Sequence, residues 1–173
     1  MKYERFEDLP VWQDSADLCA QLFDFTDDPH FKGKGDIANQ LQRAALSIPN
    51  NISEGFERST INELLTFIYY ARGSAGEVRS ILLVMKRIQA FAPLGNAIVP
   101  FVASAESISR QLRTWANSLQ NSDITGQRYL NDQSRAGYEK KHRQTGLLEE
   151  LKDQHEARLR RIKEERKQDE DQI

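Results

Sequence analysis

Apolar residues recur at steps of three and four through the first 120 positions of the chain. Such spacing places side chains on one face of a helix, and that face must be covered by another element. Segments rich in proline, glycine and aspartate separate the apolar stretches and are expected to form the connections. The pattern predicts four helices, over residues 9–26, 37–55, 61–91 and 98–119.

Local signals mark the starts of the first and third predicted helices. Asp8 is expected to cap the first helix, and Pro10 falls in its first turn, where a missing N–H costs little. Thr60 and Glu63 have the spacing of a capping box before the third helix. Both helices should therefore begin close to these signals.

The third predicted helix is the longest and carries two apolar stripes. The first keeps a heptad spacing and should face the core. It consists of Leu64, Ile68, Ala71, Ala75, Val78, Leu82 and Met85. The second consists of Phe67, Tyr70, Ser74, Ile81, Val84, Ile88 and Phe91. Because two stripes need contacts on two sides, the second one indicates packing against another subunit.

The second predicted helix has an apolar face that is interrupted by a proline and a cluster of polar residues. The apolar face consists of Ile37, Leu41, Ala45, Ile48 and Ile52. A proline in a helix interior removes a backbone hydrogen bond and costs roughly 3 kcal/mol. We expect Pro49 to kink this helix and Gly55 to mark the point where it weakens or ends.

No strand pattern is visible, and the connections are short. Residues 1–120 are therefore predicted to form an all-α, antiparallel up-and-down four-helix bundle. Residues 121–173 are expected to be a partly disordered extension, with a polar linker and a charged helix over about residues 147–167. Charges in that helix pair at i,i+4, as in Glu156 and Arg160, but its apolar edge is thin. Such a helix would need a partner.

Composition narrows the class of protein. Apolar residues make up 39% and charged residues 29%, and the formal net charge is −2, so no global charge directs the chain to nucleic acid or an anionic membrane. The single cysteine, Cys19, fits a reducing compartment. The first residues lack the apolar core of a signal peptide, and no apolar run approaches the ~18 residues of a membrane span. We therefore expect a cytoplasmic protein without a membrane partner.

Polar side chains of the second and third predicted helices fall on faces that could meet. They are Pro49, Asn51, Glu54, Arg58, Arg72, Ser74 and Glu77. Gly73 and Gly76 lie beside them, and a close helix approach would offset the cost of about 0.5–1 kcal/mol that each glycine carries relative to alanine. The cluster is either a buried polar network that sets helix register or a ligand site, and we favour the network.

Catalytic and metal-binding signatures are lacking in the sequence. A Ser–His arrangement needs a histidine near the nucleophile, and His30, His142 and His155 all lie outside the predicted bundle helices. A di-iron bundle needs two Glu-x-x-His motifs and two further glutamates, whereas only Glu139 with His142 has that spacing. No phosphate-binding or dinucleotide fingerprint is present. We expect no enzymatic activity, no metal and no cofactor.

Basic residues are thinly spread over the bundle. Residues 1–120 hold 12 Lys/Arg and 14 Asp/Glu, and the remainder holds 12 of each. Phosphate binding depends on clustered cations, so the best candidates for nucleic-acid contact are in a local basic run with Tyr129 and Tyr138 interleaved. These candidates are Arg128, Arg135, Lys140, Lys141 and Arg143. A solvated linker is the alternative interpretation of the same run.

Three motifs occur in order along the chain: residues 6–13 (FEDLPVWQ), residues 40–55 (QLQRAALSIPNNISEG) and residues 71–77 (ARGSAGE). Over about residues 5–119 the chain thereby resembles the four-helix-bundle family of 23S rRNA intervening sequence proteins. The resemblance implies an up-and-down bundle that assembles as a homopentamer, without known enzymatic activity. Family members are encoded within insertions in rRNA genes. Relatives are accessory proteins of diversity-generating retroelements that bind nucleic acid and a reverse transcriptase.

The chain departs from this family in three respects. Its bundle is mildly acidic where the retroelement proteins are strongly basic, Ser53 stands where alanine is usual, and the extension after residue 120 is longer. Two hypotheses result: an oligomeric accessory protein of RNA or a ribonucleoprotein, or a protein scaffold that recruits a partner through its C-terminal helix. The placement of basic residues on the oligomer should separate them. These residues are Arg43, Arg58, Arg79, Lys86, Arg87 and Arg113.

Overall fold

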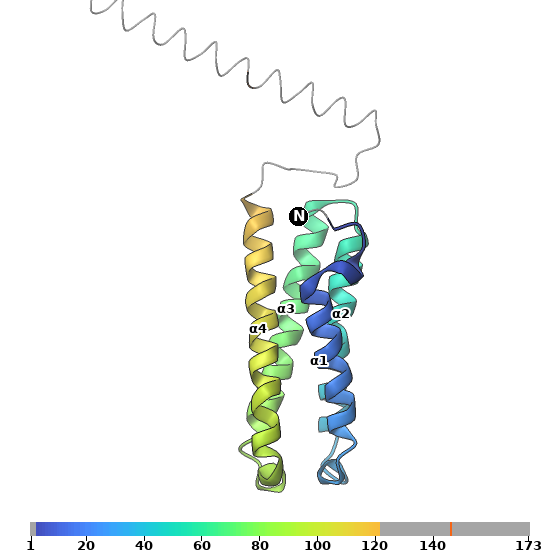
Figure 1. Cartoon of the computed structure of the whole chain (residues 1–173). Helices are drawn as coiled ribbons and strands as arrows, with labels where there is room; N and C mark the ends of the chain where they lie inside the picture. The colour runs from blue at the N-terminus through green and yellow to red at the C-terminus, as the bar shows by residue number, and fades with distance from the viewer. Residues whose placement is uncertain (1–2, 122–145, 147–173) are drawn as a thin grey trace, which may run out of the picture. The chain divides into compact units, whose positions relative to one another are not determined.

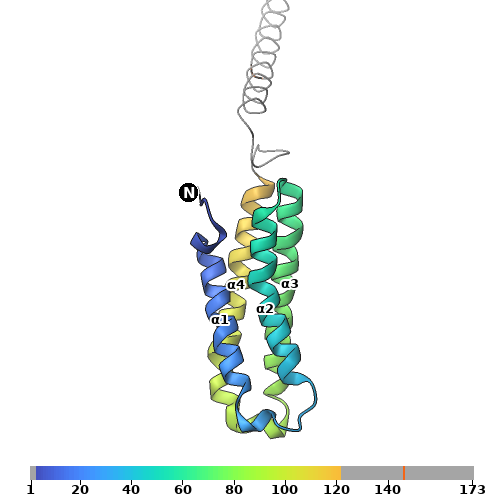
Figure 2. The ribbon, with the colours of Figure 1, turned by 90° about the vertical axis from the view of Figure 1, so that its right-hand side faces the viewer.

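The computed structural model describes residues 3–121 and residue 146. Within this part of the chain four long helices run side by side, and neighbours alternate in direction (Figures 1 and 2). They are α1 (Pro10–Thr26), α2 (Ile37–Glu57), α3 (Ile61–Met85) and α4 (Gly95–Gln120). No strand occurs among the described residues, so the predicted all-α four-helix bundle is confirmed. The linker and charged helix predicted within residues 121–173 lie outside the described residues, apart from positions 121 and 146.

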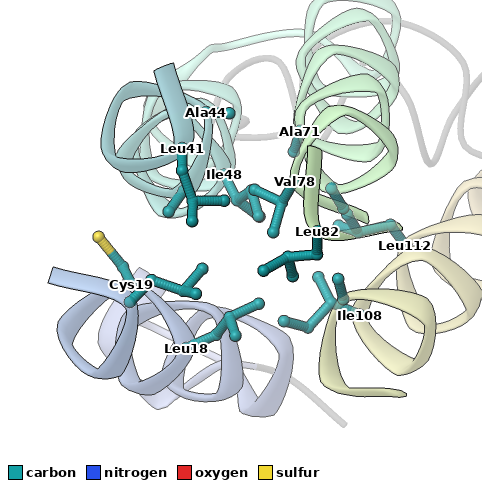
Figure 3. Packing of buried hydrophobic residues seen from close by; sticks show 14 of the residues in the cluster. Leu18, Cys19, Leu41, Ala44, Ile48, Ala71, Val78, Leu82, Ile108 and Leu112 are labelled. Atoms are coloured by element: carbon teal, nitrogen blue, oxygen red, sulfur yellow. The ribbon is translucent and has the colours of Figure 1, made fainter. Parts of the chain in front are cut away.

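The core lies along the common axis of the four helices. Figure 3 shows leucine, isoleucine and valine side chains from all four helices pointing toward one another, among them Leu18, Ile48, Leu82 and Ile108. The first stripe of α3 forms the centre of this core, since every member from Leu64 to Met85 is at most 1% exposed. Burial of one such leucine or isoleucine contributes about 1.5–3 kcal/mol. The heptad prediction for this stripe is confirmed.

The two predicted helix starts have different outcomes. The Thr60 hydroxyl accepts a hydrogen bond from the Glu63 N–H (3.2 Å) and donates to the Glu63 carboxylate (2.8 Å), so the cap on α3 is confirmed. The cap predicted for Asp8 is wrong, because Leu9 is the N-cap of α1. Asp8 instead ends a short 3-10 helix, η1 (Phe6–Asp8), in which the Leu9 N–H donates to the Phe6 carbonyl (3.0 Å).

The C-terminal end of α3 corrects the predicted length of the third helix. The helix ends at Met85 rather than at residue 91 and is followed by a turn and a 3-10 helix, η3 (Gln89–Leu94). No glycine or proline precedes Pro93 in this stretch, so local propensity alone favours a longer helix. Burial decides otherwise: the chain folds back so that Phe91 is fully buried, with its ring centroid 5.1 Å from that of Phe31.

Proline is accommodated inside α2. This helix continues from Ile37 through a buried Pro49 to Glu57, two residues beyond Gly55, so the expected end near Gly55 is approximately right. The carbonyl of Ala45 lacks its helical N–H donor because residue 49 is a proline. The expected kink at Pro49 stays a prediction. The fourth helix also begins earlier than expected, at Gly95 rather than at residue 98.

Candidate functional site

Two residues of the predicted polar cluster, Asn51 and Ser74, join Ser47 in a connected hydrogen-bond network at the contact between α2 and α3. The Asn51 side-chain amide donates to the Ser47 carbonyl (2.7 Å) and to the Ser47 hydroxyl (2.9 Å). On the facing helix, the Ser74 hydroxyl lies 3.0 Å from the Ser47 hydroxyl and 3.1 Å from the Tyr70 carbonyl. Asn51, Ser47 and Ser74 therefore link the two helices at a fixed register. The network is part-buried, so exchange with water is limited.

Arg58 and Glu54 form a second group near the C-terminal end of α2. Their side chains make an i,i+4 ion pair on the helix surface. The Arg58 guanidinium also lies over the Phe67 ring of α3, 5.1 Å from its centroid. A cation over an aromatic face is attracted by the ring quadrupole. Arg58 thus joins the end of α2 to α3, a contact that the sequence pattern did not reveal because Phe67 was assigned only to an apolar stripe.

Arg72 and Glu77 stand apart from these two groups. Neither residue makes an ion pair within 4.0 Å in the described part of the chain. Glu77 lines a polar groove of about 680 Å³ between α2 and α3, together with Arg43, Asn50 and Asn51. Pro49 is buried within α2. Of the seven predicted cluster residues, Asn51 and Ser74 belong to the network, Glu54 and Arg58 form the second group, and Glu77 lines the groove. Pro49 and Arg72 belong to none of the three.

The close approach of α2 and α3 occurs at a different glycine from the pair that the sequence suggested. A methyl group added at Gly73 or Gly76 would have no neighbour within 4 Å, so the close helix contact expected there within the chain is wrong. At Gly55 the added carbon would lie 2.7 Å from Cβ of Phe67 and 3.4 Å from the Leu64 side chain. Gly55 is the residue that allows α2 to lie against α3.

We expect the bond between Ser47 and Ser74 to couple the two helices energetically. The single variants Ser47→Ala and Ser74→Ala should each have a slightly lower free energy of unfolding. The double variant should lose less of this free energy than the sum of the two single losses. The coupling energy should be about 0.5–1.5 kcal/mol. Urea unfolding of the four proteins measures it. Ser53→Ala is the matched control, because that hydroxyl donates only to the Asn50 carbonyl of its own helix. If the losses in the free energy of unfolding of the Ser47 and Ser74 variants were strictly additive, a register-setting role would be contradicted.

The basic residues of the bundle are spread over α2, α3, α4 and the segments that follow α2 and α3. Arg79 of α3 pairs with Glu106 of α4 at 3.8 Å, and Arg58 pairs with Glu54. Lys86 and Arg87 follow α3, at the opposite end of that helix from Arg58. The candidates for nucleic-acid contact, from Arg128 to Arg143, lie outside the described residues.

Two other reactive side chains are placed by the structure. Burial raises the pKa of the Cys19 thiol, which keeps the thiol protonated and poorly nucleophilic. His30 lies in the connection after α1 and contacts the Asp28 carboxylate at 2.7 Å. The Asp28 pKa is lowered by hydrogen bonds from the His30 backbone N–H and from its ring. Among the described residues no three His, Cys, Asp or Glu side chains are grouped as metal ligands require.

A second groove, of about 780 Å³, lies between the start of α1 and the end of α4. Leu9, Val11 and Trp115 contribute apolar side chains to it, and Arg110 and Gln111 contribute polar ones. The Gln111 amide donates to the Asp14 carboxylate at 2.7 Å across this pair of helices. Sequence reasoning missed the groove, because its lining comes from positions almost 100 residues apart.

One described segment, Gln89–Gln120, has the length and apolar composition of a membrane-crossing helix. A core helix of a water-soluble protein passes the same criterion, so this evidence is weak. Ile98, Ala105, Ile108 and Leu112 of this segment are buried against the other helices. These residues form the core-facing stripe of α4.

Comparison with known proteins completes the description of the site. A family model described as "23S rRNA-intervening sequence protein" matches residues 7–114. This match runs from η1 into α4 and contains the whole α2–α3 contact. A search among curated proteins gave no match.

Proposed function

The chain belongs to the family of 23S rRNA-intervening sequence proteins, and from this premise we propose that it is a non-enzymatic accessory protein of RNA or a ribonucleoprotein. The observation that carries the proposal is the family match over residues 7–114, which covers nearly the whole bundle. The family description names an RNA context and no reaction. An accessory role therefore agrees with both the match and the structure of the polar cluster.

The use of the polar side chains supports a role without catalysis. The donors of Asn51 and Ser74 are directed to Ser47 and to backbone carbonyls of the same helices. A general base or nucleophile needs a free lone pair or proton aimed at a substrate. These residues instead join α2 to α3, so their chemistry is structural in our proposal.

RNA contact is assigned in this proposal to the basic run after the bundle. Cations within the bundle are dispersed along it and partly paired with Glu54 and Glu106, which weakens their attraction for phosphate. The run after α4 contains five cations within 16 positions, from Arg128 to Arg143. Clustered cations release counterions from RNA and bind with a steep salt dependence.

We further propose that the protein is a cytoplasmic homo-oligomer, a homopentamer by the family resemblance. Only part of the predicted second stripe supports subunit contacts, because Phe91 is buried within the protomer and Ile81 and Ile88 pack against its core. Tyr70 and Val84 of this stripe are 58% and 51% exposed in the protomer, more than large apolar side chains usually are in a bundle without a partner.

An electrophoretic shift of structured RNA across a salt series tests the RNA assignment. In the test variant the five candidate cations are changed to glutamine (Arg128, Arg135, Lys140, Lys141 and Arg143). The matched control removes the same charge further along the chain, at Arg158, Arg160, Arg161, Lys163 and Arg166. The test variant should bind more weakly by at least about tenfold and with a shallower salt slope, whereas the control should shift RNA like the unchanged protein.

The scaffold hypothesis is the second candidate, and the dispersed, partly paired cations of the bundle favour it. It predicts that the unchanged protein does not shift RNA even at low salt. That result would contradict RNA association and leave a protein partner as the function. Equal loss of binding in both glutamine variants would instead contradict the assignment to residues 128–143 alone.

A further inference from the structure

The polar groove of about 680 Å³ between α2 and α3 is lined by side chains that have no other partner in the described part of the chain. Gln40, Arg43 and Asn50 line it from α2, and Glu77 lines it from α3. None of these four side chains makes a hydrogen bond or an ion pair with another described residue. The volume lies within the range of roughly 300–1,000 Å³ that is usual for small-ligand sites. The groove therefore has both the room and the free polar groups to hold a ligand.

Arg43 and Glu77 lie nearly level with each other on the two helices that form the groove. The Ser47 and Ser74 hydroxyls meet at 3.0 Å and fix the register of α2 against α3. These helices run in opposite directions (Figure 2), so a step back from Ser47 corresponds to a step forward from Ser74. Arg43 is four positions back and Glu77 is three positions forward, which leaves a difference of about 1.5 Å along the helix axis. Their charged atoms are nevertheless more than 4.0 Å apart, so a ligand can lie between them.

The balance of charge in the groove disfavours a phosphate group. Among the described residues that line it, the carboxylates of Asp36, Glu54 and Glu77 outnumber the single cation, Arg43. The Glu54 carboxylate is already paired with Arg58, whereas Asp36 and Glu77 make no ion pair with a described residue. Carboxylates repel an anion at this distance. The ligand should therefore be neutral and should offer donors to Glu77 and acceptors to Arg43.

Guanine is the nucleobase whose edges match this pair of side chains. Its O6 and N7 atoms are adjacent acceptors that receive two hydrogen bonds from one guanidinium. Its N1–H and 2-amino groups are adjacent donors that reach both oxygens of one carboxylate. Adenine and cytosine have a single amino donor group, and uracil has one N–H between two carbonyls. Of the four RNA bases, only guanine thus presents two adjacent acceptors at one edge and two adjacent donor groups at another.

Apolar and amide side chains complete the groove. Leu46 is 45% exposed, lines the groove and follows Arg43 by three positions, so it offers an apolar surface to the face of a flat base. Gln40 and Asn50 lie about one turn before and two turns after Arg43 on the same helix. Amide side chains there can donate to and accept from ribose hydroxyls. The arrangement has the features by which proteins recognise unpaired RNA bases, which are hydrogen bonds to the base edges and cover for the base face.

We propose that the groove between α2 and α3 binds a guanine base, whose N1–H and 2-amino groups donate to the Glu77 carboxylate and whose O6 and N7 accept from the Arg43 guanidinium. The base reaches the groove either as an unpaired residue of RNA or as a free nucleoside. The RNA source rests on the proposed function and deepens it. Phosphate contacts position an RNA and base contacts specify it, so the groove would select a sequence that the cations after α4 hold.

Calorimetric titration of the full chain with neutral nucleosides tests the groove in the absence of RNA. Guanosine should bind at least about tenfold more tightly than adenosine, because adenosine cannot make the paired contacts to Glu77. Inosine lacks the 2-amino group and 7-deazaguanosine lacks the N7 acceptor. Each of them should bind more weakly than guanosine by roughly threefold to tenfold, the usual effect of one lost hydrogen bond.

Two variants assign these contacts to their side chains. In Glu77→Gln the preference for guanosine over inosine should disappear, and in Arg43→Gln the preference over 7-deazaguanosine should disappear. Complete loss of guanosine binding in either variant would support the same contacts. Glu57→Gln and Arg113→Gln are the matched controls, since both residues are exposed and line no part of this groove, and both should keep the preferences. Weaker binding of all nucleosides with unchanged preferences would overturn the assigned contacts, and circular dichroism checks that each variant is folded.

A pair of hairpin RNAs that differ only in the loop, guanines in one and adenines in the other, distinguishes the two sources of the base. If the base belongs to RNA, the guanine hairpin should bind at least about tenfold more tightly, and Glu77→Gln should remove the difference. Equal binding of the hairpins with selective binding of guanosine would assign the groove to the free nucleoside. No preference for guanosine and none for the guanine hairpin would overturn the guanine site and leave RNA association in place. Selective guanosine binding by a protein that shifts no RNA would contradict the proposed function alone.

Discussion

Replacement of Phe91 by alanine should lower the free energy of unfolding by about 3–5 kcal/mol, because it removes a fully buried aromatic side chain and leaves a cavity. The Phe91 ring is within 5.1 Å of the Phe31 ring, centroid to centroid, and Phe31 contacts Phe25 at 5.4 Å. Phe25 in turn lies 5.0 Å from Phe101 of α4. These four rings close the end of the bundle where α3 turns into α4.

Urea unfolding followed by circular dichroism measures this loss. Val99→Ala is the control, because Val99 is half exposed and its truncation should change the free energy of unfolding by no more than about 0.5 kcal/mol. A loss for Phe91→Ala as small as that of the control would show that the aromatic end of the bundle can collapse around the cavity. It would also contradict our explanation for the early end of α3.

Replacement of Gly55 by alanine should destabilise the bundle by about 1–2 kcal/mol, although alanine is the better helix former. The new methyl carbon would lie 2.7 Å from Cβ of Phe67. This neighbour is attached directly to the α3 backbone, so the two helices must separate to make room. The same shift would disturb the Arg58 guanidinium over the Phe67 ring.

Gly73→Ala is the matched control for this prediction, and its effect on the free energy of unfolding should have the opposite sign. Space is open around Gly73, so alanine there should stabilise the protomer by about 0.5–1 kcal/mol through helix propensity alone. Thermal unfolding of both variants in the same buffer makes the comparison. If both glycines responded alike, the difference in packing between Gly55 and Gly73 would have no energetic consequence.

These predictions concern the scaffold on which the proposed function depends. The family match ends within α4, whereas the candidate RNA contacts begin after it. The bundle would then supply assembly and orientation, and the extension would supply phosphate-binding cations. The RNA shift tests the contribution of the extension, and the mass of the unchanged protein, measured by light scattering, tests assembly independently.

Most of the fold was predictable from the sequence because its signals are local or strictly periodic. The buried stripe from Leu64 to Met85 follows a heptad, and the cap at Thr60 depends on a residue three positions away. Every member of such a stripe is apolar because it is buried, so the pattern can be recognised even when one position departs from it. The polar contact between Asn51, Ser47 and Ser74 was also within reach, since helical spacing places these residues on facing sides.

Only the tertiary structure decided where α3 ends, which glycine is needed and how the polar cluster is divided. The burial of Phe91 against Phe31, the closeness of Gly55 to Phe67 and the isolation of Arg72 all depend on atoms from distant segments. Local propensity contributes at most about 1 kcal/mol per residue for residues other than proline, whereas burial of a phenylalanine contributes about 1.5–3 kcal/mol. The sequence by itself therefore determined the helices and the core face, and packing between distant segments determined their ends and their contacts.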